Sequence, residues 1–169
     1  MIPLVAEQGL ARFCDVFTER SAFSVEESRR VLLAGKAAGL RPKLHADQLT
    51  AGGGAELAAE AGAASADHLE CISDEGIAAM AEAGVVAVSL PLATLYLRKT
   101  PLPARKLLEA GVPVAVATDF NPGSAPSYDL PLALLLACTL QGMTPAEALN
   151  GATTVAARAI DLQDEVGSL

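Results

Sequence analysis

The sequence predicts an α/β fold built on a parallel sheet, in a single domain that covers residues 1–169. Short apolar segments rich in Val and Ala recur along the chain, and a segment of helical character follows each of them. They are spaced about 25 to 35 residues apart, which is typical of repeated βαβ units. The segment over 112–117 is apolar without alternation, as expected for a strand buried on both faces. A hydrophobic content of 51% is sufficient for a packed core.

The helices are predicted from their terminal residues. Ser24 and Thr144 each stand three residues before a glutamate, which is the pattern of a capping box. Ser73 begins a helix with an acidic first turn, and glycines follow several of the apolar helical stretches. The expected elements are, in order, a helix tail over 3–10, a strand over 12–17, a helix over 24–39, a strand over 43–45, a helix over 55–61, a strand over 66–69, a helix over 73–84, a strand over 85–90, a loop over 91–100, a helix over 103–110, a strand over 112–118, and helices over 131–140 and 144–159.

Composition argues against several classes of protein. The net charge is −8 and no cluster of Lys and Arg is present, which argues against a nucleic-acid partner. No apolar run reaches the roughly 18 residues of a membrane span, so no membrane association is expected. The three cysteines are odd in number and far apart, and fit neither a disulfide framework nor a metal motif. We expect buried reduced thiols in a cytoplasmic protein.

Polar side chains cluster where the predicted strands end. The set comprises Glu19, His45, Gln48, His68, Asp119 and Asn121, and it contains both histidines of the chain. Carboxyl ends of parallel strands meet at one edge, where α/β folds place their chemistry. Imidazole and carboxylate together suit a divalent metal such as zinc or iron. A lone histidine in an apolar context is more often structural, and an aspartate before Asn-Pro-Gly is also a good turn initiator. From position alone, these residues can be either metal ligands or structural residues.

Three segments carry a resemblance to a known family. They are Lys-Leu-His-Ala-Asp-Gln over 43–48, Ala-Ser-Ala-Asp-His-Leu-Glu over 64–70, and Ala-Thr-Asp-Phe-Asn-Pro-Gly-Ser over 117–124. They closely resemble segments of the imidazolonepropionases, amidohydrolase-superfamily enzymes of histidine degradation. The similarity runs from about Pro3 through Leu162, and it implies a metal-dependent (β/α)₈ barrel, of the TIM type, with a small β-sandwich.

The resemblance also implies roles for single residues. His45 and Asp119 match metal ligands of the family, where one divalent metal, zinc or iron, is bound. His68 and Asp119 match catalytic residues, with His68 placed to polarise the substrate carbonyl. Substrate-binding positions of the family correspond to Gln48, Asn121, Gly123 and Ser124. The implied reaction opens the ring of a small-molecule substrate, 4-imidazolone-5-propanoate, to N-formimino-L-glutamate.

The chain is shorter than the family pattern. A barrel of this kind typically has about 250 residues, and the resemblance covers about strands four to eight. The N-terminal barrel half, with its His-x-His pair, and the β-sandwich domain have no counterpart here. We therefore expect the isolated chain to bind metal weakly or not at all and to be inactive alone, and to self-associate or need the missing N-terminal half.

Three alternatives remain. Another amidohydrolase, such as a deaminase of a cyclic nucleobase, would share the same strand-end residues. A non-catalytic half-barrel fragment would explain the missing ligands. An open α/β binding domain is disfavoured, because neither GxGxxG nor a P-loop is present.

Overall fold

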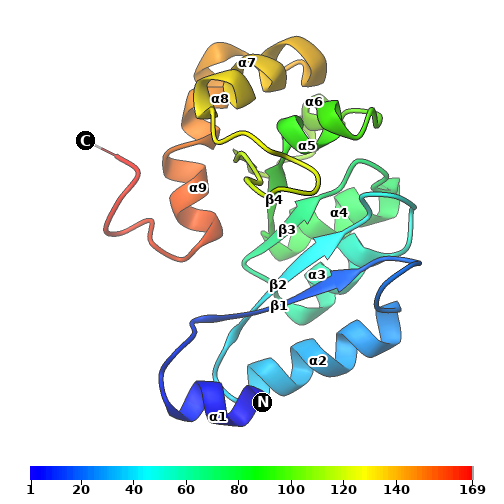
Figure 1. The fold of residues 1–169 in the computed structure, drawn as a ribbon, viewed down its shortest axis with the longest axis vertical. Coiled ribbons are helices and arrows are strands. Elements are labelled where there is room, and N and C mark those ends of the chain that lie inside the picture. The colour runs from blue at the N-terminus through cyan, green and yellow to red at the C-terminus, as the bar shows by residue number, and fades with distance from the viewer. Residues whose placement is uncertain (169) are drawn as a thin grey trace.

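The computed structural model describes residues 1–168, so the last residue of the predicted domain, at position 169, lies outside the described residues. Five parallel strands form one sheet in the order β1-β2-β3-β4-β5. Their bounds are β1 Phe13–Thr18, β2 Arg41–Ala46, β3 Ser65–His68, β4 Val86–Ser89 and β5 Val114–Val116. Spatial order equals chain order, so each connection carries the chain to the next position along a curving sheet (Figure 1). The predicted parallel α/β fold is confirmed.

Nine helices surround the sheet within the described residues. They are α1 Ile2–Glu7, α2 Val25–Ala37, α3 Gly54–Ala61, α4 Asp74–Ala83, α5 Pro91–Tyr96, α6 Ala104–Glu109, α7 Leu130–Gln141, α8 Pro145–Gly151 and α9 Thr154–Ala159. Both predicted capping boxes are present, at Ser24 with Glu27 and at Thr144 with Glu147. In Figure 1, α2 lies beside β1 and β2 at one end of the molecule, and α7 and α8 lie at the other.

The two faces of the sheet differ in their surroundings. On β1, Cys14 and Val16 are buried, and a Cβ on Gly35 of α2 would lie 2.6 Å from the Cβ of Cys14. This face is therefore the one that packs directly on the helices. Alternation along the strand turns Asp15 and Phe17 to the opposite, concave face, where both are exposed. The concave face is where a barrel would have its interior.

Two predictions of local structure are wrong. Residues 91–100 are not all loop, because Pro91 begins α5 as its first helical residue, a position where proline is favoured. The single helix predicted over 144–159 is two helices, α8 and α9, interrupted at Thr153, whose φ of −122° and ψ of −96° are not helical. The break follows Gly151, where an added Cβ would lie 2.9 Å from the carbonyl oxygen of Val114.

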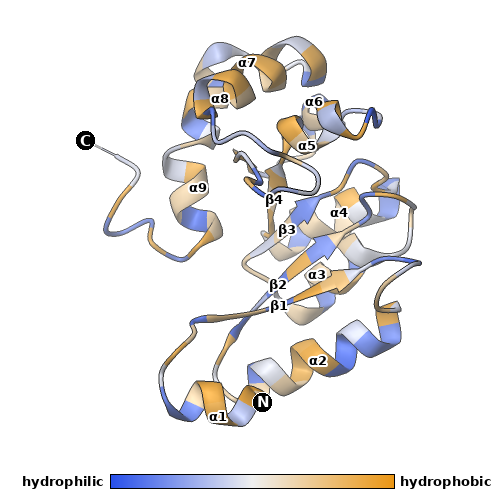
Figure 2. Ribbon diagram, viewed as in Figure 1, coloured by the Kyte–Doolittle hydropathy of each residue, from blue (hydrophilic) through white to orange (hydrophobic). Residues whose placement is uncertain are grey.

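The remaining features concern the three cysteines and the exposed apolar residues of the helices. Cys14 is buried as predicted, whereas Cys71 and Cys138 are only half-buried, and all three thiols are free. Figure 2 shows that α7 is hydrophobic over most of its length, and Leu135 and Leu140 on it are exposed. Within residues 1–168, every helix is too short or too polar to cross a membrane.

Candidate active site

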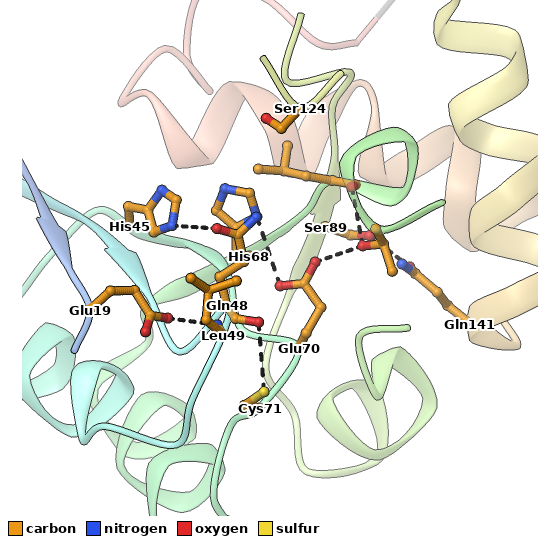
Figure 3. A network of polar contacts seen from close by, with 12 residues as sticks. Glu19, His45, Gln48, Leu49, His68, Glu70, Cys71, Ser89, Ser124 and Gln141 are labelled. Carbon is orange, nitrogen blue, oxygen red and sulfur yellow. Dashed lines mark hydrogen bonds and ion pairs between the residues drawn. The ribbon is translucent and has the colours of Figure 1, made fainter. Parts of the chain in front are cut away.

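The two histidines meet at the carboxyl edge of the sheet. His45 lies on β2 and His68 ends β3, and their ring centroids are 4.0 Å apart. The ring of Phe17, directly opposite His45 in the β1–β2 register, contacts His45 edge-on at a centroid distance of 3.8 Å. Figure 3 shows the two imidazoles side by side, below Ser124 and above Gln48 and Glu70. The predicted convergence of strand-end residues is therefore present for the histidines.

The surroundings of His45 determine its tautomer and its charge. The side-chain oxygen of Gln48 lies 2.9 Å from Nε2 of His45, so Nε2–H donates to it (Figure 3). Burial, and then the charge of His68, lowers the pKa of His45 to about 3. The ring is thus neutral near pH 7, which is the form that ligates metals. With Nε2 protonated, Nδ1 carries the lone pair that a metal would use.

Asp119 lies three residues beyond β5, on a turn organised by Asn121. The side-chain Oδ1 of Asn121 accepts from the backbone N–H groups of Gly123 and Ser124, both at 2.8 Å. Its Nδ2 donates to the backbone oxygen of Asp119 at 2.6 Å. Burial raises the pKa of the Asp119 carboxyl, and the nearby His68 lowers it. The Asn-Pro-Gly-Ser segment is thus the turn that presents Asp119. The predicted substrate contacts of Asn121, Gly123 and Ser124 stay predictions.

Strained backbone marks the same edge. Asp47, His68, Leu69 and Asp119 all have positive φ, at 49°, 80°, 66° and 54°. Such conformations cost of order 1–3 kcal/mol each and concentrate at functional sites. His68 ends β3, Asp47 and Leu69 directly follow a strand, and Asp119 lies three residues beyond β5, so these four lie at the edge where the chemistry is predicted. The other two described non-glycine residues with positive φ, Arg98 and Asp161, follow helices instead.

Two other acidic residues at this edge support the loops. Asp47 is buried, and its carboxylate accepts from the backbone N–H groups of Gly52 and Gly54 at 2.8 and 3.2 Å, and from that of Ala55 at 2.8 Å. Glu19 accepts from the backbone N–H of Leu49 at 2.7 Å. The backbone of Gly52 and of the first residues of α3 therefore wraps around the Asp47 carboxylate. The bond between Glu19 and Leu49 connects the end of β1 to the loop after β2.

A charged layer lies beneath the histidines on the concave face. Lys43 is two residues before His45, and its Nζ donates to Oγ of Ser65 at 2.6 Å and lies 3.8 Å from Oδ1 of Asp67. In the sheet register Asp15 stands opposite Lys43. Although the side chain of Asp15 is accessible to solvent, its neighbours on the concave face partly desolvate it. This desolvation, and then the charge of Asp67, raises the pKa of Asp15. None of these residues stands out from the sequence, because each looks like an ordinary polar position of an alternating strand.

Sequence reasoning also missed a buried carboxylate behind His68. Glu70 follows His68 by two residues, and its Oε1 accepts from Oγ1 of Thr94 at 2.6 Å. A neighbouring pair, Ser89 and Gln141, is joined by a bond from the serine hydroxyl to Oε1 at 2.6 Å (Figure 3). No local signal in the sequence identifies Glu70, because its direction depends on the left-handed backbone at His68 and Leu69.

The donor set fits a metal in kind but is incomplete. His45 offers a neutral imidazole and Asp119 a carboxylate, the two ligand types that zinc and iron accept. Across residues 1–168, no three His, Cys, Asp or Glu side chains are arranged to hold a metal ion. A catalytic zinc site normally takes three protein ligands. His45 and Asp119 alone are fewer protein ligands than such a site has.

Comparisons with known proteins show the family and the fold to which the chain is similar. Residues 18–169 match the amidohydrolase family. The imidazolonepropionase of Geobacillus kaustophilus is 57% identical over 169 residues, covering 100% of this chain and 40% of the relative. That of Anaeromyxobacter dehalogenans strain 2CP-1 is 59% identical over 165 residues, covering 97% of this chain and 39% of the relative. The chain thus spans about 40% of the length of the curated relatives it matches.

Solved structures share the fold at lower identity. A zinc-bound adenosine deaminase from Xanthomonas campestris superposes with a TM-score of 0.73 at 24% identity, covering 88% of this chain and 38% of its own. A Xaa-Pro dipeptidase superposes with a TM-score of 0.76 at 20% identity, covering 99% of this chain and 48% of its own. The sheet therefore has the fold of part of an amidohydrolase barrel. From the family match over most of its length and from this fold, the chain belongs to the amidohydrolase family.

Proposed function

We propose that this chain forms part of an enzyme that hydrolyses a cyclic amide C–N bond, opening 4-imidazolone-5-propanoate to N-formimino-L-glutamate. The observation that carries the proposal is the 57% identity to an imidazolonepropionase over the whole chain. That similarity includes the segments that hold His45, His68 and Asp119. Deaminases among the structural neighbours are at most 24% identical and support only the fold.

His45 and Asp119 would hold one divalent metal, zinc or iron. The lone pair on Nδ1 of His45 and the Asp119 carboxylate are the donors that this chain contributes. When bound, such a metal supplies a nucleophile at neutral pH by lowering the pKa of its water. Asp119 would take the proton of that water as general base.

The remaining residues would bind and polarise the substrate. His68, whose ring contacts that of His45, would act on the substrate carbonyl, where negative charge develops. Gln48 is fixed by its bond to His45 and would face the imidazolone ring. The turn of Asn121, Gly123 and Ser124 would hold the propanoate end of the substrate.

Completion of the site requires further protein. We propose that the part of the relatives that this chain does not match supplies the other metal ligands, and that the chain alone is inactive. Among the described residues the sheet ends on β1 at one side and β5 at the other, and a single bridge from Thr18 to Phe23 lies beyond β1. We propose that a partner strand adds at these edges. Such a partner would be the rest of a barrel or a second copy of this chain. We place the reaction in the cytoplasm.

A substrate comparison tests the proposed function. The chain is mixed with a polypeptide that matches the remainder of an imidazolonepropionase, with zinc or iron(II), and assayed on imidazolone propanoate, adenine, guanine and cytosine. We expect turnover of imidazolone propanoate alone, abolished by Asp119→Asn. Turnover of a nucleobase in preference would instead support the deaminase alternative. Lack of turnover on all four by a folded, metal-loaded complex would support the non-catalytic fragment.

A further inference from the structure

Two buried polar atoms near the site face each other without a hydrogen-bond partner. They are Nδ1 of His68 and Oε2 of Glu70, which lie 3.8 Å apart. The side chains are only 4% and 2% exposed. Leaving a buried polar group unpaired costs about 1–3 kcal/mol, so two such atoms beside each other are each other's natural partners.

The carboxylate of Glu70 points toward the imidazole ring of His68. Its Oε1 is held by Oγ1 of Thr94 at 2.6 Å, on α5, which leaves Oε2 directed at His68 (Figure 3). The chain between the two residues passes through left-handed conformations at His68 and Leu69. This strained turn brings the side chains of residues 68 and 70 together, although β3 has already ended at His68.

We propose that Glu70 is the positioning residue of His68, accepting a hydrogen bond from Nδ1–H and thereby fixing which ring nitrogen carries the proton. The 3.8 Å separation needs to close by less than 1 Å to reach the length of an ordinary N–H···O hydrogen bond. A carboxylate is an acceptor only, so Nδ1 must be the donor. The other nitrogen, Nε2, then has a free lone pair and points away from Glu70 (Figure 3).

The assignment refines the role of His68, and its catalytic meaning depends on the proposed function. In this tautomer the neutral ring accepts a proton at Nε2. Only after Nε2 has gained that proton does it donate a hydrogen bond to a substrate oxygen or to the leaving nitrogen. The negative charge of Glu70 stabilises the ring while it carries that proton, as the buried acid does in a Ser-His-Asp triad.

A nuclear magnetic resonance experiment on this chain tests the inference without substrate. Because the chain has only two histidines, a long-range ¹H–¹⁵N spectrum of ¹⁵N-histidine-labelled protein in alkaline buffer contains two rings. His68→Gln identifies the signals of position 68. We expect Nδ1 of His68 to be the protonated, pyrrole-type nitrogen. In Glu70→Leu it should become pyridine-type as the proton moves to Nε2, since Nδ1–H would have no acceptor.

Glu56→Leu is the matched control. Glu56 also accepts from a hydroxyl, that of Ser73 at 2.6 Å, and also has a buried unpartnered Oε2, but it contacts neither histidine. The tautomer of His68 should be unchanged in this variant. A pyridine-type Nδ1 in the unaltered chain overturns the inference even if Glu70→Leu fails to fold. So does an unchanged tautomer in folded Glu70→Leu, or an equal change in Glu56→Leu. Failure of the substrate comparison would leave all these readouts intact.

Discussion

Removal of the Asp47 carboxylate should destabilise the chain more than any ordinary helix cap. Asp47 is 2% exposed and accepts three backbone N–H groups of the loop that leads into α3. In Asp47→Ala, the N–H groups of Gly54 and Ala55 are left buried without an acceptor. Each costs about 1–3 kcal/mol, and water entering the space left by the carboxylate offsets part of that cost. We expect a loss of about 3 kcal/mol in the free energy of unfolding.

Urea unfolding followed by circular dichroism measures this loss. Asp129→Ala serves as the matched control, because Asp129 caps α7 at the surface with a single bond to the N–H of Leu132. An exposed cap of this type is worth about 1 kcal/mol. Asp47→Asn keeps one carbonyl acceptor and should fall between the two. If Asp47→Ala loses no more free energy than Asp129→Ala, the buried bonds to Asp47 do not support the loop as described.

Three further outcomes are expected. Because the pKa of His45 is lowered to about 3 in the folded chain, the unfolded chain binds more protons below about pH 6.5. The free energy of unfolding should therefore fall as the pH is lowered, by about 1 kcal/mol between pH 6.5 and 5 after allowance for the partial exposure of His45. In His45→Gln, this contribution to the pH dependence of unfolding should be absent. Gly54→Ala should cost about 2 kcal/mol in urea unfolding by overpacking, since its Cβ would lie 2.7 Å from that of Ala46. Gly52→Ala, with nothing nearer than 3.6 Å, should cost far less. Light scattering at micromolar concentration should give a mass above the 17.2 kDa of one chain; a clean monomer would contradict the expected self-association.

The strands and most helices could be predicted because their signals are local. Apolar runs, capping boxes and terminal glycines report on the nearest few residues, and these features gave the correct element order. The errors lie where a local signal has two meanings. Proline is a signal both for the end of a strand and for the start of a helix, and Pro91 begins α5. The helix is interrupted after Gly151, whose backbone lies against the carbonyl oxygen of Val114. The interruption at Gly151 thus depends on a residue distant in sequence.

The site could be predicted to the level of the edge on which it lies. His45 and His68 do meet there, because parallel strands in register bring their carboxyl ends together. The role of Asn121 in its own turn, and that of Glu70 behind His68, could not be predicted. Each depends on side-chain direction after a residue with positive φ, and the sequence gives no indication of such conformations at non-glycine positions.

Metal content is the most direct test of the central claim, which is that this chain contributes His45 and Asp119 to a metal site completed by other protein. The measurement is zinc and iron per chain by mass spectrometry after dialysis, for the chain alone and for its mixture with the remainder of an imidazolonepropionase. We expect well under one equivalent alone and about one per complex after mixing, lost again in Asp119→Asn. One tightly held equivalent in the chain alone would contradict the claim, and so would a mixture whose metal content is unaffected by Asp119→Asn.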